Sequence, residues 1–299
     1  MKHQLLPSLF IALLYGMATT SIHALQKTVL VTGSTDGIGL TTAKHMAKKG
    51  YTVLLHGRNQ QRIDQAEKEV KKFASSSSVV ALPPCDLSTA AGSRQLVRCT
   101  CDALGGQPLH VLMNNAGVYS DSKVVTDDGL ELTFAVNVLA PFIVSSLLLP
   151  HIQDRIVIAS SLSQCRSIRD WDDVAFCDNR SYSAHTAYSE SKLLDAMLCM
   201  EMADRLHDVT ITCNCLDPGT VNTKMLLAGW GPIGISVRDA LDQTWLCTDP
   251  EVEGVSGKYY VHQTAQRASS AAYDTSEREK MWRLLSQLAP DASDMWNYP

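Results

Sequence analysis

Residues 28–39 run TVLVTGSTDGIG and carry the clearest structural signal in the chain. An apolar, β-branched run at 28–32 leads into a glycine-rich turn, and residues 41–49 then follow a helical pattern. Glycines in such a turn allow a tight bend, a close approach of the backbone to a pyrophosphate, and close packing of helix on strand. The helix that follows offers free N–H groups to phosphates. These features predict a dinucleotide site formed by Gly33, Ser34, Thr35, Asp36, Gly37, Ile38 and Gly39.

The rest of the chain alternates between buried strands and helices. Strands are expected at 52–56, 79–82, 110–113, 155–159 and 209–216, and helices at 61–73, 93–104, 133–149, 186–206 and 275–288. This rhythm predicts an α/β fold: a single doubly wound Rossmann domain, with a parallel sheet and helices on both faces. Because no repeat or linker divides residues 26–299, we expect one domain that binds its ligands beyond the carboxyl ends of the strands.

The composition narrows the class of ligand. The 299-residue chain is 45% hydrophobic and 19% charged, which suits a packed core and excludes a disordered chain. A formal net charge of -5 gives no reason to expect nucleic-acid binding. The nine cysteines include no C-x-x-C pair and are odd in number, so we expect neither a metal site nor a disulfide framework. A small molecule is the expected ligand.

Residues 1–25 form a distinct N-terminal segment. Lys2 precedes an uncharged stretch whose most apolar part, 5–17, is shorter than the about 20 residues of a spanning helix. This pattern favours a signal peptide or an uncleaved membrane anchor, and hence an endomembrane, secretory or membrane-associated location. The alternative is a helix packed on a soluble domain, in the cytoplasm or an organelle.

The end of the second predicted strand bears on cofactor choice. An NAD site normally has an acid there for the ribose 2′-hydroxyl, but Gly57 takes that place, and Arg58 can meet a 2′-phosphate. We therefore expect NADP rather than NAD, the alternative being that Arg58 is merely solvent-exposed. After the third strand, Asp86 can accept from the adenine amino group, with Leu87 beside it, or it can cap a helix near Ser88.

Tyr188 and Lys192 lie four residues apart on the helix expected at 186–206 and so share one face. A nearby ammonium lowers the pKa of a phenol, which lets the tyrosine exchange a proton with an alcohol or a carbonyl oxygen. Taken alone, this spacing is more often an accident of an amphipathic helix. Its weight comes from the other motifs.

Six motifs follow one another along the chain: Thr32-Gly33…Gly37-Ile38-Gly39, Asn114-Asn115-Ala116-Gly117, Asn137, Ser160-Ser161, Tyr188…Lys192 and Pro218-Gly219. In this order they resemble the short-chain dehydrogenase/reductase family over essentially everything after Lys27. The resemblance implies a general acid/base in Tyr188, with Lys192 as its pKa partner and a ribose ligand. It further implies that Ser161 rather than Ser160 polarises the carbonyl, and that Asn137 holds the lysine and the water of a proton relay. The remaining cofactor contacts that it implies come from Asn115, Ala116, Gly117, Pro218, Gly219, Val221 and Thr223.

One departure concerns the segment before the tyrosine. Ser161 and Tyr188 are 27 positions apart, which is longer than the common family pattern and resembles the retinol dehydrogenase and WW-domain oxidoreductase branch. The apolar stretch at 225–235 adds to this, because it occupies the family's substrate loop and favours a hydrophobic substrate. An ordinary buried connection is the alternative explanation for that stretch.

These observations lead to two competing functions. The first is an NADP-dependent oxidoreductase that interconverts a carbonyl and an alcohol on a retinoid-, steroid- or aldehyde-like substrate, with a homodimer possible. The second is a catalytically weak cofactor-binding scaffold or redox-sensing interaction protein. A sugar-nucleotide epimerase is disfavoured, since only about 80 residues follow Pro218, too few for its substrate domain.

Overall fold

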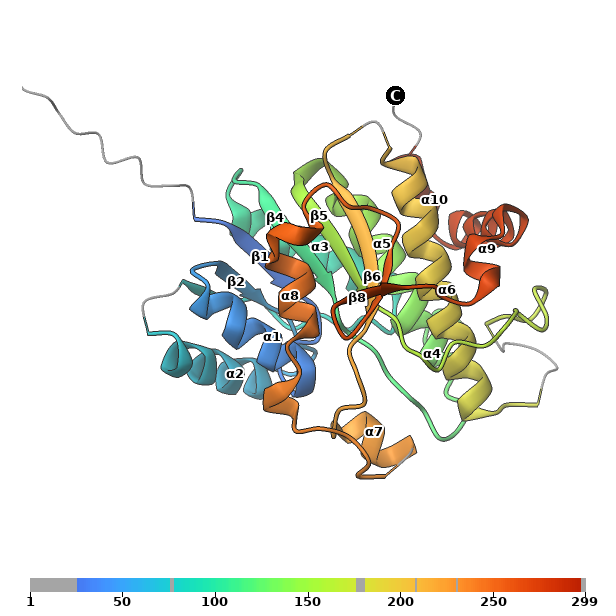
Figure 1. Ribbon diagram of the computed structural model, residues 1–299, viewed down its shortest axis with the longest axis horizontal. Coiled ribbons are helices and arrows are strands. Elements are labelled where there is room, and N and C mark those ends of the chain that lie inside the picture. Colours follow the sequence, from blue (N-terminus) through green and yellow to red (C-terminus); the bar gives the residue numbers. More distant parts are fainter. Residues whose placement is uncertain (1–25, 76–77, 176–180, 208, 230, 297–299) are drawn as a thin grey trace, which may run out of the picture.

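The computed structural model describes residues 26–75, 78–175, 181–207, 209–229 and 231–296, leaving out the side chains of 228–229. Within these residues, eight strands form one sheet in the order β3-β2-β1-β4-β5-β6-β7-β8 (Figure 1). Neighbouring strands are parallel as far as β7, and β8 pairs with β7 antiparallel. The strands are β1 Thr28–Val31, β2 Thr52–Leu55, β3 Val79–Ala81, β4 Leu109–Asn114, β5 Ile152–Ala159, β6 Thr212–Asp217, β7 Tyr259–Val261 and β8 Thr264–Gln266.

Helices cover both faces of the sheet, which confirms the doubly wound fold predicted from the sequence. One face carries α1 (Gly37–Lys48), α2 (Gln60–Phe73) and α8 (Asp242–Thr248). The other carries α3 (Ala90–Leu104), α5 (Ala140–Leu148) and α6 (Ala184–Arg205), with α9 (Thr275–Leu288) and α10 (Pro290–Asp294) packed outside them. The short helices α4 (Leu132–Phe134) and α7 (Lys224–Gly229) complete the set, and α7 stands apart at the bottom of Figure 1.

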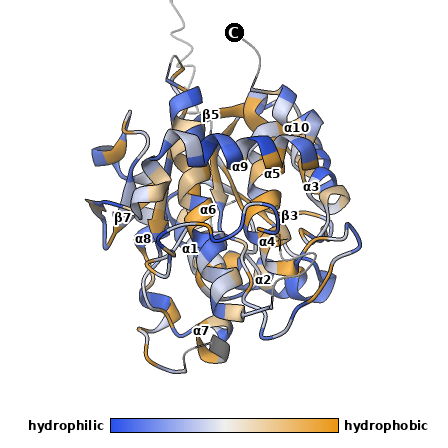
Figure 2. Ribbon diagram, turned by 90° about the vertical axis from the view of Figure 1, so that its right-hand side faces the viewer, coloured by the Kyte–Doolittle hydropathy of each residue, from blue (hydrophilic) through white to orange (hydrophobic). Residues whose placement is uncertain are grey.

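Strand alternation divides the core into two layers. Val29 and Val31 join the cluster under α1 and α2, whereas Leu30 joins the cluster under α3, α5 and α6, because successive side chains point to opposite faces. In Figure 2 the apolar α5 lies beneath the hydrophilic outer face of α9. The helical stretch at residues 132–151 is long and apolar enough to cross a membrane. However, 83% of its apolar 18-residue window is buried inside the structure, as in a core helix. The predicted signal or anchor segment lies outside the described residues.

Capping residues explain where the observed helices differ from the predicted ones. The first helix begins at Gly37 rather than 41, since the Asp36 side chain accepts the Gly37 N–H. Likewise α3 begins at Ala90 rather than 93, because Thr89 accepts from Gly92 N. The N-cap role considered for Asp86 therefore belongs to Thr89. The helix expected at 133–149 is interrupted by a π-helical turn, Ala135–Leu139, a feature often found at functional sites.

Candidate active site

A cavity of about 540 Å³ opens where the strands of the sheet end at their carboxyl termini. Its walls come from the β1–α1 turn, the end of β2, the loops after β3 and β4, and α6. Most of the residues predicted to contact a cofactor line it: Gly33, Thr35, Asp36, Gly37, Ile38, Gly39, Arg58, Asp86, Leu87, Asn115, Ala116, Gly117, Tyr188, Lys192, Pro218 and Thr223. The predicted cofactor contacts that do not line it are Ser34, Gly219 and Val221. Of the predicted catalytic residues, Asn137 and Ser161 do not line it, whereas Ser160 does.

The glycine-rich turn needs its glycines for two different reasons. Gly33 and Gly37 have φ angles of +64° and +56°, in the left-handed region that favours glycine. Gly39 is needed for space, because a Cβ there would lie 2.4 Å from the Gly33 carbonyl oxygen. Ser34 serves the turn rather than the cavity: its buried hydroxyl accepts the His56 N–H at 2.9 Å. The N-terminus of α1 is thereby held against the cavity wall.

His56 connects this turn to two strand ends. The Gly33 N–H donates to His56 Nδ1 at 3.0 Å, so the ring proton is on Nε2, which donates to the Cys85 carbonyl at 3.1 Å. Burial lowers the pKa of His56 to about 4, which keeps the ring neutral and Nδ1 an acceptor. His56 was not predicted as a site residue, although its position at the carboxyl end of β2 places it at the edge of the sheet where ligands bind.

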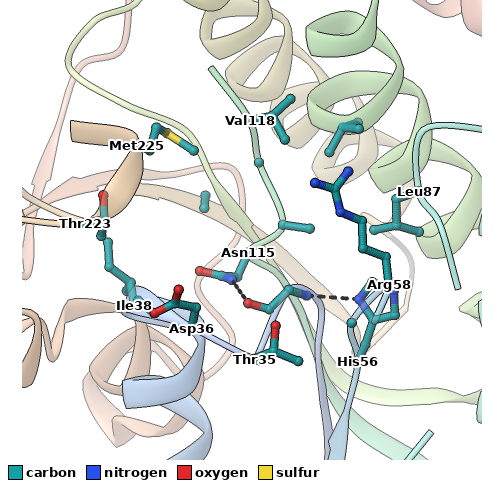
Figure 3. A pocket seen from close by; sticks show the side chains of 18 of the residues that line it. Thr35, Asp36, Ile38, His56, Arg58, Leu87, Asn115, Val118, Thr223 and Met225 are labelled. Atoms are coloured by element: carbon teal, nitrogen blue, oxygen red, sulfur yellow. Dashed lines mark hydrogen bonds between the residues drawn. The ribbon is translucent and has the colours of Figure 1, made fainter. Parts of the chain in front are cut away.

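The end of β2 leaves little room for a side chain at position 57. A Cβ on Gly57 would lie 2.5 Å from Thr35 Cγ2, so a larger residue here would require the Thr35 side chain to shift. Figure 3 shows Arg58 reaching over the cavity from one wall, opposite Thr223 and Met225 on the other. Arg62, in the first turn of α2, also lines the cavity and was not predicted.

Tyr188, Lys192 and Ser161 come together at the carboxyl end of β5. Lys192 Nζ lies 5.6 Å from the centroid of the buried Tyr188 ring and donates to the Ala159 carbonyl at 2.8 Å. Ser161 hydrogen-bonds to Tyr188. By contrast, the Ser160 hydroxyl donates to the Lys192 carbonyl at 2.7 Å, which makes it part of the helix–strand packing.

Opposing effects set the proton affinity of the tyrosine. Burial raises the pKa of Tyr188 above its ordinary value, and the Lys192 ammonium lowers it by a smaller amount. Asp195 and Asp217 add to the rise, whereas the hydrogen bond from Ser161 opposes it. Lys192 lowers the pKa of Tyr188, as predicted, but burial has the larger effect. The pKa of Tyr188 therefore lies above the ordinary value of a tyrosine instead of being lowered toward neutral pH.

Asn137 lies on the π-helical turn and ties two parts of the site together. Its Oδ1 accepts the Val118 N–H at 2.8 Å, and its Nδ2 donates to Ser191 Oγ at 3.0 Å. In the described part of the chain its hydrogen bonds go to Val118 and Ser191 and not to Lys192. The two side chains nevertheless face each other, since a Cβ on Gly117 would lie 3.5 Å from Asn137 Oδ1 and 3.8 Å from Lys192 Nζ.

The segment after β6 closes the remaining side of the cavity. Asp217 accepts the Gly219 N–H at 2.7 Å, and Val221 pairs with Ile235 in an isolated bridge. Lys224 forms an ion pair with Asp36, which links α7 to the glycine-rich turn. Met225, predicted as part of the substrate loop, lines the cavity beside Thr223. Lys224 and Gln243 also line it and were not predicted; the Gln243 Nε2 donates to Asn115 Oδ1 at 3.0 Å.

Comparison with known proteins agrees with this geometry. Residues 27–169 match the family model described as short chain dehydrogenase. The chain is 30% identical to human polyprenol dehydrogenase over 278 residues, covering 86% of this chain and 83% of that protein. It is 32% identical to human retinol dehydrogenase 14 over 289 residues, covering 86% and 84%. An uncharacterized protein from Mycobacterium Paratuberculosis shares the fold, with a TM-score of 0.70 and 24% identity over 88% of this chain and 93% of that one.

Proposed function

The chain belongs to the short-chain dehydrogenase/reductase family, and from that premise we propose that it is an NADP-dependent enzyme that interconverts a carbonyl and an alcohol on a small lipophilic substrate. Membership makes it an NAD(P)-dependent oxidoreductase acting on CH–OH groups. The observation that carries the proposal is that Tyr188 and Lys192 line the same cavity as the glycine-rich turn, with Ser161 hydrogen-bonded to Tyr188 behind the cavity wall. Both the acid/base group and a dinucleotide cradle are then within reach of one substrate.

The cavity fits a dinucleotide in its shape and its charges. The left-handed Gly33 and Gly37 bring bare backbone to the wall at the N-terminus of α1, where a pyrophosphate is favoured. Arg58 and Arg62 line the cavity at the end of β2, where Gly57 takes the place of the acid of an NAD site, which supports the 2′-phosphate of NADP over the free hydroxyl of NAD.

The protein's own groups would handle the proton of the reaction. Bound NADP supplies or takes up the hydride. Ser161 donates a hydrogen bond to the carbonyl oxygen, and Tyr188 gives that oxygen its proton during reduction or removes it during oxidation. The ammonium of Lys192 favours the phenolate that results. Because Tyr188 is only 8% exposed, water has little access to this proton.

The substrate end supports a lipophilic molecule. The segment that carries Thr223 and Met225 into the cavity also exposes Leu227, Ile233 and Ile235. Single exposed apolar residues are ordinary on a surface, but three within one short segment that also lines the cavity support an apolar binding surface. The relatives named for retinol and polyprenol, both lipophilic alcohols, point in the same direction. We further propose that residues 1–25 place the enzyme at a membrane or in the endomembrane system, and N-terminal sequencing of the native protein tests whether they are retained.

Turnover of NADPH and NADH against a panel of retinoids, steroids, quinones and short aldehydes tests the activity. Tyr188→Phe should lower kcat by about 10²- to 10⁴-fold, because it removes the proton donor, while NADPH binding is kept. Near-wild-type turnover by this folded variant would show that Tyr188 is not the acid/base. A wild-type protein that binds NADPH yet reduces no member of the panel would favour the scaffold alternative.

A further inference from the structure

A buried carboxylate accompanies the lysine of the site. Asp195 lies one turn after Lys192 on α6, and its Oδ2 is 2.8 Å from Lys192 Nζ, with side-chain exposures of 1% and 5%. The other oxygen, Oδ1, has no hydrogen-bond partner among the described residues. Among the described residues, the carboxylate therefore makes its hydrogen bond to the ammonium that acts on Tyr188.

Stability does not explain this ion pair. Replacing a buried pair by packed apolar side chains is often neutral or stabilising, because desolvation offsets the attraction between the charges. Leu198, one turn further along α6 from Asp195, is a fully buried apolar residue. A leucine or an alanine would suit that environment at lower electrostatic cost. We therefore look for the role of Asp195 in its contact with Lys192.

We propose that Asp195 is a positioning residue that holds the Lys192 ammonium and partly neutralises it, and so sets the pH at which the tyrosine–lysine pair loses its first proton. This inference rests on the proposed acid/base role of Tyr188. Burial raises the pKa of Asp195 itself to about 7. Above that pH the ionised carboxylate shares the ammonium with the phenol, which weakens the pull of Lys192 on the phenolate. Tyr188, Lys192 and Asp195 titrate as one coupled set. The effect of Asp195 therefore appears in the apparent pKa values of that set.

The other charged and titratable groups around the pair have different roles. Asp217, at the end of β6, also raises the pKa of Tyr188, but its carboxylate accepts the Leu162 and Gly219 N–H groups at 2.6 and 2.7 Å. From the loop after β4, the Tyr119 ring packs edge-on against Tyr188 at 5.7 Å and also against His185. The β5 side presents the Ala159 carbonyl, which is uncharged. Asp195 is thus the carboxylate whose contact is with the lysine itself.

Direct evidence comes from titrating the tyrosine in Asp195→Asn. The amide keeps the size and the acceptor oxygen of the carboxylate but removes its charge. The apparent pKa of the set should fall by about one unit, the lower end of what a nearby charge produces. Two readouts are used: ultraviolet tyrosinate absorbance as a difference from Tyr188→Phe, and the pH at which alcohol oxidation with NADP rises. Asp204→Asn is the matched control, since this exposed acid on the same helix pairs with Arg278 outside the cavity.

The outcomes separate this inference from the proposed function. A fall in both readouts for Asp195→Asn, with none for Asp204→Asn, supports it. A fall in the pKa measured by tyrosinate absorbance, without a matching shift in the pH dependence of turnover, supports the tuning of Tyr188 but contradicts its acid/base role. An unchanged or raised pKa overturns the inference. If Asp195→Asn does not fold, Asp195→Ser is titrated in the same way, and failure of both to fold shows that the carboxylate serves the fold instead.

Discussion

His56 should make the stability of this protein depend on pH in a way that one substitution removes. Its ring is buried, with Nδ1 accepting the Gly33 N–H and Nε2 donating to the Cys85 carbonyl. Protonation would turn Nδ1 into a second donor facing the Gly33 N–H. Burial accordingly lowers the pKa from 6.5 to about 4.

The sign and the size of the effect follow from that difference. The unfolded chain takes up the proton first, since the pKa of His56 is lower in the folded state. The stabilisation is fully present above about pH 6.5 and is lost as the pH falls toward about 4. A difference of about 2.5 units corresponds to about 3 kcal/mol in all, of which about 2 kcal/mol is already lost at about pH 5.

Urea unfolding of wild type and His56→Asn at about pH 7.5 and about pH 5 measures this. The Asn Oδ1 can accept the Gly33 N–H but cannot reach the Cys85 carbonyl, so the variant should be about 1 kcal/mol less stable at neutral pH. At about pH 5 the wild type should have lost about 2 kcal/mol of its free energy of unfolding, whereas the variant lacks the titrating ring and should not. The variant should then be the more stable of the two. Other buried histidines cancel in the difference, and the exposed His151→Asn should show no such change. A gap that is the same at both pH values would refute the reasoning.

Two further predictions concern the cavity and the segment beside it. Arg58→Ala should weaken NADPH binding by roughly 10- to 100-fold and NADH binding little, because a charge-assisted contact to phosphate contributes about 1.5–3 kcal/mol. Fluorescence titration with both cofactors measures this, and equal losses of affinity would contradict the assignment of Arg58 to a 2′-phosphate. Ile233→Ser should raise KM for a long apolar substrate by roughly 10- to 100-fold and leave KM for a short aldehyde unchanged, since burying one such side chain contributes about 1.5–3 kcal/mol. Val209→Ser is its control, because this exposed apolar residue (54% against 67% for Ile233) lies outside the predicted substrate loop. A rise in KM for both substrates would contradict the substrate-loop assignment.

The fold and the family were readable from local patterns. The run at 28–39 predicted strand, turn and helix from consecutive residues, and the structure confirms the doubly wound sheet that follows. Helix starts were misplaced by a few residues, because the caps at Asp36 and Thr89 are single side-chain contacts that periodicity does not register. The β7–β8 hairpin was not predicted, since strands of three residues are too short for an alternating pattern to stand out.

The order of motifs determined which residues belong to the site, and the tertiary structure decided what surrounds them. Tyr188 and Lys192 could be paired from a spacing of four residues, because helix geometry is local. Burial is not local. Burial raises the pKa of Tyr188 against the effect of Lys192, and it keeps His56 neutral. It also makes the ion pair between Asp195 and Lys192, three residues apart on α6, a buried one. Desolvation and through-space charge depend on residues brought together from β5, β6 and α6, and only the folded chain brings them together.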